Sequence, residues 1–211
     1  MVQVLQTGTA GLDGMTERPA AGVVVVMPAI DMAQAQAAAA RMLRLAGTES
    51  PPALLIVEDR ARLGFIAVVN AVCAACRPEH LAYVAQDALA GRDWLRHALS
   101  RLSGTGRSLC ALNDGIWQGA VAQFGVLRCA FFEEVYGAGQ VFYPGYRRHR
   151  ADEEITHYAH HAGQLCFDPR ALMMEVDYRP ARPIDPEDSA LYFRRKPGVR
   201  QAALARAAAQ G

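Results

Sequence analysis

The sequence lacks the short motifs that identify three common enzyme classes. It has no Gly-x-Gly-x-x-Gly fingerprint, no Walker phosphate loop and no Gly-x-Ser-x-Gly elbow. These motifs set backbone N–H groups against a phosphate or place a serine on a sharp turn. Their absence removes the main support for dinucleotide oxidoreductases, phosphate-loop enzymes and serine hydrolases.

An excess of charge of one sign is also missing. The 211 residues carry 22 Lys and Arg against 21 Asp and Glu, which gives a formal net charge of +1. Nucleic-acid-binding domains usually gather an excess of basic residues on one face. We therefore expect no nucleic-acid partner.

Long apolar runs and a disulfide framework are absent as well. The apolar run at residues 20–30 is about half of the length that spans a bilayer, and no basic secretory start precedes it. The cysteines are five, an odd number without disulfide spacing, which suits a reducing compartment: Cys73, Cys76, Cys110, Cys129 and Cys166. Cys73 and Cys76 have no second pair to complete a zinc site, so we expect core residues of one helix. The expected location is the cytoplasm, with peripheral attachment to the inner face of a membrane as the alternative.

The sequence does contain a series of buried-strand patterns. Residues 23–28 and 54–59 are continuous apolar runs, and a third run over residues 83–87 stops on Asp87. Unbroken apolar runs suit strands that are covered on both faces. The Ala-rich segment 32–46 predicts a crossover helix between the first two strands. This alternation predicts an α/β fold with a mostly parallel central sheet and right-handed crossovers.

One compact domain is expected, with irregular ends. The length and the 52% hydrophobic content suit a single core. Residues 1–21 lack sustained periodicity and are interpreted as an N-terminal arm, either loose or a stray edge strand. The domain is predicted over residues 22–195. Prolines in residues 179–187 predict a break in regular structure, and residues 196–211 are predicted to form a C-terminal tail or helix with little to bury.

Four short motifs follow the predicted elements in order. The first is a strand that ends in a proline-containing turn (residues 27–31), and the second is a strand that ends in paired acids (57–59). The third is a helix that opens on Gly and carries an Asn (64–70), and the fourth is a strand that ends in an acid before a Trp-Leu pair (86–95). In order and spacing these motifs resemble family 2 glycosyltransferases, whose GT-A fold is a Rossmann-like three-layer sandwich. The resemblance covers about residues 23–193. It implies a nucleotide-binding edge formed by Pro28, Ala29, Glu58, Asp59 and Asn70.

The same resemblance makes Asp87 a ligand of a divalent metal, Mn²⁺ or Mg²⁺. Such a metal, held by one or two carboxylates, neutralises the charge of a departing nucleoside diphosphate. The alternative is that Asp87 caps a helix that begins near Arg92. The chain departs from the family pattern because Gln86 stands at an earlier acidic position and no late His completes the site. Asp177 or Glu175 is the candidate replacement for that His.

The second half of the chain resembles the acceptor side of the family. Trp117 lies in a predicted strand and turn beside the active site, and Asp152, Glu153 and Glu154 match the acidic motif at the start of the acceptor helix. By this match Asp152 is the catalytic base, because an inverting transfer needs a carboxylate near the attacking hydroxyl. The alternative is that the three acids only complement the helix dipole.

Two further clusters carry charge. His157, His160 and His161 share one predicted helix, where a solvated or acceptor-facing set is favoured over a metal site. The basic run at residues 147–150 is interpreted as a solvated loop or as a contact for a sugar phosphate or an anionic acceptor.

The sequence thus predicts a metal-assisted, inverting glycosyltransferase. Its expected partners are a UDP- or GDP-linked sugar and a glycan, lipid-linked or protein acceptor. The alternative is a catalytically silent GT-A-like protein that binds nucleotide or serves assembly.

Overall fold

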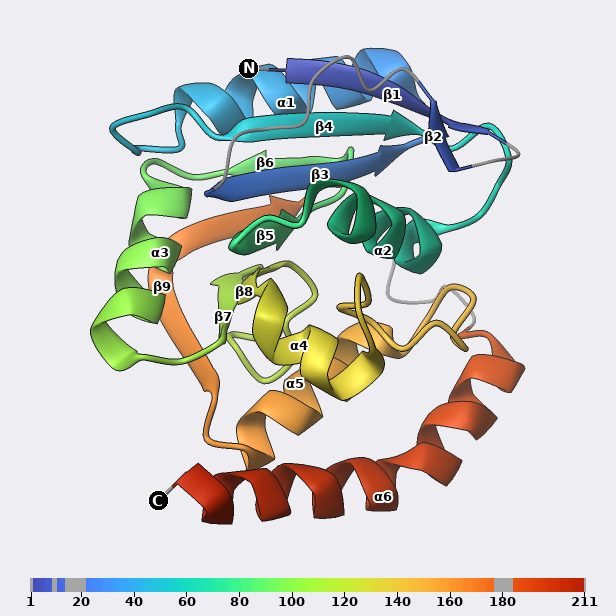
Figure 1. Ribbon diagram of the computed structural model, residues 1–211. Coiled ribbons are helices and arrows are strands. Elements are labelled where there is room, and N and C mark those ends of the chain that lie inside the picture. The colour runs from blue at the N-terminus through green and yellow to red at the C-terminus, as the bar shows by residue number, and fades with distance from the viewer. Residues whose placement is uncertain (1, 9–10, 14–21, 177–183, 211) are drawn as a thin grey trace.

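Helices surround a central sheet in the computed structural model, which describes residues 2–8, 11–13, 22–176 and 184–210 (Figure 1). The strands are β1 (Val2–Gly8), β2 (Gly11–Asp13), β3 (Val23–Ala29), β4 (Ala53–Glu58), β5 (His80–Tyr83), β6 (Ala88–Ala90), β7 (Leu109–Asn113), β8 (Gly125–Arg128) and β9 (Leu165–Glu175). The helices are α1 (Met32–Arg44), α2 (Phe65–Cys76), α3 (Trp94–Thr105), α4 (Cys129–Tyr136), α5 (Ala151–His161) and α6 (Pro186–Gln210).

The described strands form one nine-stranded sheet in the order β2-β1-β4-β3-β5-β8-β7-β9-β6. The predicted α/β class is confirmed, but the prediction of a mostly parallel sheet is wrong. The pairs β1/β4, β4/β3, β3/β5 and β7/β9 are parallel, whereas β1/β2, β5/β8, β8/β7 and β9/β6 are antiparallel. The sheet is mixed because β8 enters between β5 and β7 antiparallel to both.

Successive residues of the central strands face two different hydrophobic clusters. Leu54 and Ile56 of β4 pack with residues of α1 and α3, whereas Leu55 and Val57 pack with residues of α2, α4, α5 and α6. Both faces of the sheet are therefore covered, which explains why the sequence of these strands is apolar without alternation. The three-layer sandwich stays a prediction.

The first crossover follows from local sequence. The side chain of Asp31 caps α1 by accepting a hydrogen bond of 3.0 Å from the backbone N–H of Gln34. Ala35, Ala39 and Met42 are buried on one side of this helix. Small residues on that side let α1 lie close against the sheet.

The chain between Asp87 and α3 contains a short strand that was not expected. Residues 88–90 form β6, and the residue at the N-cap position of α3 is Asp93. The alternative role of Asp87 as a helix cap is therefore wrong. The indole of Trp94 is fully buried and donates a 3.0 Å hydrogen bond to the carbonyl oxygen of Met42.

Helix α6 runs without interruption through position 196, where the sequence suggested the start of a tail. It spans 25 residues and accommodates Pro197. Tyr192, Val199 and Ala203 are buried in the core. This end of the chain therefore contributes to the same core as the sheet.

The five cysteines are free and buried, and Cys73 and Cys76 lie in α2 as expected. Among the helices of the described residues, none combines the length and the apolar content that a membrane crossing requires.

Candidate active site

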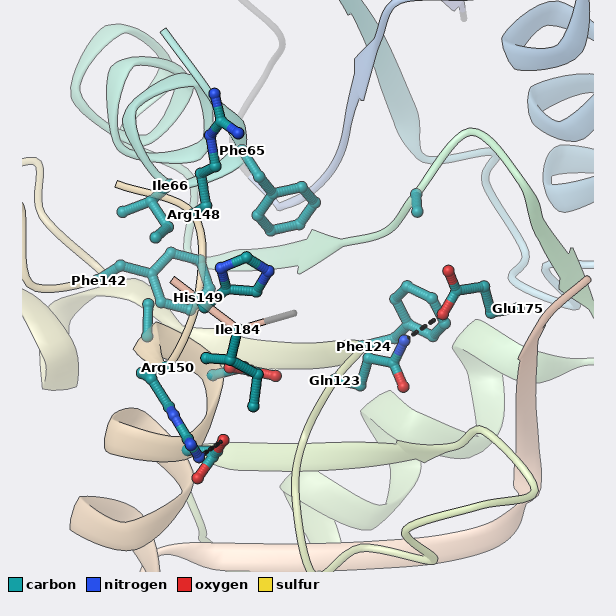
Figure 2. A pocket seen from close by; sticks show the side chains of 14 residues that line it. Phe65, Ile66, Gln123, Phe124, Phe142, Arg148, His149, Arg150, Glu175 and Ile184 are labelled. Carbon is teal, nitrogen blue, oxygen red and sulfur yellow. Dashed lines mark hydrogen bonds and ion pairs between the residues drawn. The ribbon is translucent and has the colours of Figure 1, made fainter. Parts of the chain in front are cut away.

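A pocket of about 350 Å³ opens where several strand ends meet two helix starts. Ala85 follows β5, Gln123 and Phe124 precede β8, and Glu175 ends β9. The first residues of α2 and of α5 close the other side, together with the loop before α5. Figure 2 shows Gln123 and Glu175 on one side of the pocket and Arg148, His149 and Arg150 on the other.

Asp152 lies on the pocket wall in the first turn of α5 and is half-buried. Burial raises its pKa to about 6, against the opposing effect of backbone N–H groups and of the Arg150 charge. A carboxylate with this pKa is ionised at pH 7 and still basic enough to take a proton in a transition state. Asp152 is therefore a carboxylate on the pocket wall that is ionised at pH 7 and more basic than an ordinary aspartate.

The two acids after Asp152 have different partners. Glu153 lines the pocket and forms an ion pair of 2.5 Å with Arg150. Glu154 is buried beneath the helix, where it accepts two hydrogen bonds from Arg195 at 2.8 and 2.9 Å and one from Tyr146 at 2.7 Å. Glu154 thus joins α5 to α6 and does not line the pocket.

Asp87 lies in the turn between β5 and β6. Its backbone carbonyl accepts a 3.0 Å hydrogen bond from the N–H of Val176, and Ala88 pairs with Glu175 in the sheet. Its carboxylate makes no hydrogen bond or ion pair with the described residues. Glu175 accepts a 2.5 Å hydrogen bond from the side chain of Gln123. The backbone of Asp87 thus lies beside the end of β9, but Asp87 is not among the residues that line the pocket, whereas Glu175 is. Asp177 lies outside the described residues.

Within the described residues no group of three or more His, Cys, Asp or Glu side chains is arranged to hold a metal ion. Gln86, at the earlier position of the predicted metal motif, has another role. Its side-chain oxygen accepts hydrogen bonds from the N–H groups of Ile30 and Asp31 at 2.7 and 3.0 Å. Gln86 therefore ties the turn before α1 to the turn that carries Asp87.

The paired acids lie beside the end of β3, because Ala29 pairs with Glu58 and the backbone of Asp59 bonds to Ala29 at 2.8 Å. Pro28 precedes Ala29 in the same strand. Glu58 forms an ion pair of 2.8 Å with Arg60 and leaves part of its side chain exposed.

The carboxylate of Asp59 is used inside its own loop. It accepts hydrogen bonds from the N–H groups of Leu63 and Gly64 at 2.9 and 2.7 Å and from the hydroxyl of Thr7 at 3.1 Å. This arrangement fixes the loop that leads into α2 and holds it against β1.

Asn70 is buried and bonds to protein backbone. Its oxygen accepts from the N–H groups of Val141 and Phe142, and its amide donates to the carbonyl of Phe142, each at 3.0 Å. Asn70 thus fixes the backbone of Phe142, whose side chain lines the pocket.

Trp117 lies in the loop between β7 and β8 and is 44% exposed. The carboxylate of Asp114 accepts hydrogen bonds of 2.8 Å from the N–H groups of Ile116 and Trp117 and so fixes the start of this loop. Trp117 does not belong to the residues that line the pocket.

Asp188 fixes the backbone of the basic run before α5. This buried carboxylate in the first turn of α6 accepts hydrogen bonds of 2.8–2.9 Å from the N–H groups of Arg147, Arg148 and His149. Burial opposes ionisation, yet these N–H groups lower the pKa of Asp188 below its ordinary value. The Arg148 guanidinium is exposed at the pocket and makes no hydrogen bond or ion pair with the described part of the chain.

Several pocket residues carry no signal in the sequence. The apolar walls come from Phe65, Phe124, Phe142 and Ile184, which are indistinguishable from core residues until the fold is known. Gln123 is a single polar residue in an irregular loop. Only a three-dimensional arrangement places these side chains around Asp152.

Comparisons with known proteins give a match in structure and none in sequence. No protein-family model and no curated protein matches the sequence. Drosophila β-1,4-galactosyltransferase 7, solved with manganese, UDP-Gal and xylobiose, superposes with a TM-score of 0.59 at 12% identity. The match covers 81% of this chain and 79% of that one.

A fragment of TarS from S. aureus, solved with UDP, superposes with a TM-score of 0.60 at 12% identity over 84% of this chain. The match covers 65% of that fragment, and 38% of a longer TarS structure, so this chain spans less than two thirds of TarS. Both proteins are GT-A glycosyltransferases. The predicted resemblance is confirmed at the level of architecture, and the chain has the GT-A fold.

Proposed function

We propose that the protein is a glycosyltransferase that moves a sugar from a nucleotide-diphospho-sugar to a hydroxyl acceptor with inversion at the anomeric carbon. The observation that carries the proposal is Asp152, a half-buried carboxylate with a pKa raised to about 6 on the wall of a pocket at the strand ends. The GT-A fold adds support, because its solved neighbours include complexes with UDP-Gal and with UDP.

In this proposal Asp152 accepts the proton of the acceptor hydroxyl as that oxygen attacks the anomeric carbon. Proton removal by a positioned base typically contributes 10²–10⁴-fold to a rate. The apolar side chains of Phe65, Phe124 and Phe142 line the same space, and charge interactions are stronger beside apolar walls than in bulk water. Glu153, on the same wall, and Trp117, on the neighbouring loop, are the candidates for contacts to the acceptor.

The nucleoside is proposed to lie along the edge formed by Pro28, Ala29 and Glu58. Glu58 keeps exposed surface, whereas the loop contacts of Asp59 and the backbone contacts of Asn70 suggest that these two residues shape the site. Arg148 is the candidate partner for the diphosphate, because its guanidinium reaches the pocket without a protein counter-charge in the described residues.

Asp87 and Glu175 are the candidate ligands of a divalent metal. Both offer hard oxygen donors, and Mg²⁺ or Mn²⁺ often takes only one or two protein carboxylates beside substrate phosphates. When bound there, the metal would neutralise charge on the departing diphosphate. Asp177 is a further candidate ligand from the sequence.

A second candidate function is nucleotide binding without turnover. The observation in its favour is Gln86, which stands in place of an acid and uses its side chain to hold the turn at Ile30 and Asp31. This arrangement leaves Asp87 as the single acid of the predicted metal motif. Under either function the proposed setting is the cytoplasm, with glycan, lipid-linked or protein acceptors for the enzyme.

The test has a binding arm and a turnover arm. In the binding arm, UDP and GDP should raise the melting temperature more with Mn²⁺ than without it, and Asp87→Asn should remove the Mn²⁺-dependent part because it removes a ligand charge. In the turnover arm, release of UDP or GDP is followed from a panel of nucleotide sugars. Asp152→Asn should slow release about 10²–10⁴-fold while nucleotide binding stays nearly unchanged.

Glu134→Gln is the control, since it changes an exposed acid on α4 that does not line the pocket. Nucleotide binding without turnover in any condition would favour the second function. Absence of binding by either nucleotide would contradict both.

A further inference from the structure

A second concave site lies between α5 and α6, the two helices that lie side by side at the bottom of Figure 1. This cleft has a volume of about 480 Å³. Its lining contains four groups that can be cationic, two from each helix, together with one aromatic residue and one proline: His157, His161, Lys196, Arg200, Phe193 and Pro197. On each helix the two basic groups are four residues apart and therefore share one face.

The cleft contains no acid to balance these groups. The lining residues include no Asp or Glu. The acids nearest in sequence on α5 are engaged elsewhere, Glu153 with Arg150 and Glu154 with Arg195. Arg200 makes no hydrogen bond or ion pair with the described residues. The cleft is therefore a region of uncompensated positive charge.

The pKa values of the two histidines in the cleft are affected by this charge. Burial, together with the charges of His161, Lys196, His160 and Arg200, lowers the pKa of His157 to about 4. Burial and the same basic neighbours also lower the pKa of His161. The Nε2 atom of His157 is buried and has no hydrogen-bond partner within the described residues. The site thus combines positive charge with a buried polar atom that has no partner in the described residues.

We infer that the cleft between α5 and α6 binds the phosphoryl group of an anionic ligand through Lys196, Arg200, His157 and His161. A metal cation would be repelled by Lys196 and Arg200, whereas an anionic phosphoryl group has several oxygens that accept hydrogen bonds from such donors. Phe193, 61% exposed at the cleft, provides an apolar surface for the rest of the ligand. The phosphoryl group comes either from a small molecule in solution or from a lipid headgroup. This site is separate from the pocket at Asp152, and the inference does not depend on the proposed transfer reaction.

The first arm of the test uses inorganic phosphate as the probe. Its affinity is measured by calorimetry at pH 6, with chloride added to match ionic strength. Lys196→Gln and Arg200→Gln should each weaken binding about tenfold or more, because each removes a charged donor. Arg194→Gln is the matched control, an exposed arginine on the same helix that does not line the cleft. Melting temperatures show whether each variant is folded.

A nuclear magnetic resonance titration of the histidines gives a readout that packing alone would not change. A bound anion stabilises the protonated imidazole, so phosphate should raise the pKa of His157 and of His161. Affinity should accordingly increase as the pH falls from 6 to 5, a range in which inorganic phosphate stays a monoanion and the histidines gain protons. An unchanged titration of both histidines at saturating phosphate would overturn the inference.

The second arm compares vesicles of phosphatidylcholine with vesicles that also contain phosphatidic acid. Binding only to the latter, lost in Lys196→Gln and Arg200→Gln and kept in Arg194→Gln, would identify a lipid headgroup. Binding of free phosphate without vesicle binding would identify a soluble ligand. Equal losses in all three variants, or no binding in either arm, would overturn the proposed site.

Discussion

At the scale of single residues, Asp152 combines a useful basicity with a cost to stability. Its pKa is raised from 3.8 to about 6, so ionisation above that pH opposes folding. Asp152→Asn should therefore raise the free energy of unfolding at pH 8 by about 1–3 kcal/mol. At pH 3 the gain should vanish, because the carboxyl is then protonated in the folded and in most of the unfolded chains.

Urea unfolding of both proteins at the two pH values measures this difference. Glu134→Gln serves as the control, since Glu134 is an exposed acid on α4 that does not line the pocket with Asp152. A stability gain that is the same at pH 3 and pH 8 would contradict a role for the ionised carboxylate.

The side-chain roles that are hardest to predict from the sequence belong to residues whose hydrogen-bond partners are distant in the chain. Asn70 bonds to a residue 72 positions away, Gln86 to one 56 positions away and Glu154 to one 41 positions away. A polar residue in a motif predicts that a contact is made, but the motif does not say whether its partner is a ligand or the protein. The apolar run over residues 83–87 predicted a strand that ends on Asp87, but β5 ends at Tyr83 and Asp87 lies in the turn before β6.

At the scale of elements, the loop before α5 depends on Asp188 in α6. Asp188→Ala should leave three N–H groups without their acceptor and lower the free energy of unfolding by about 2–4 kcal/mol. The stabilisation belongs to the ionised carboxylate. It is present above the ordinary pKa of 3.8 and lost as the pH falls through the lowered value.

Hydrogen exchange provides the local measurement, with faster exchange expected at residues 147–149 in Asp188→Ala. Glu187→Ala is the matched control, because Glu187 is the neighbouring acid and pairs with Arg147 at a surface where both side chains are 71% exposed. Such surface pairs contribute little to stability. Equal exchange in the two variants would remove Asp188 from this role.

Elements that are buried on both faces could be predicted, and elements that are short or covered on one face could not. The strands β3 and β4 and the helix α1 lie where the apolar runs placed them. The strand β8 has only four residues, and nothing in so short a run specifies that it lies antiparallel to β5 and β7. Its direction follows from the loop that brings Gln123 and Phe124 back to the pocket.

At the scale of the whole molecule, α6 belongs to the domain that contains the sheet. Deleting residues 196–211 removes the buried side chains of Val199 and Ala203 and the ion pair of Arg206 with Glu134. We expect the free energy of unfolding to fall by at least about 2 kcal/mol, since burial of one aliphatic side chain contributes 1.5–3 kcal/mol.

Deletion of residues 208–211 is the control for that experiment, because Ala208 and Ala209 are exposed. Urea unfolding compares the two shortened chains with the full one. Equal stability of the full chain and the chain ending at residue 195 would support the prediction that residues 196–211 form a tail or helix with little to bury.

The contacts of Asp188 and Arg195 also set an order of events during synthesis. The N–H groups of residues 147–149 and the carboxylate of Glu154 find their partners about 40 positions further along the chain. At roughly 5–20 residues per second, a ribosome needs a further 2–8 seconds to supply them. The wall of the pocket that holds Asp152 is therefore completed last, after the strands β3 to β5 have left the ribosome and can already bind one another.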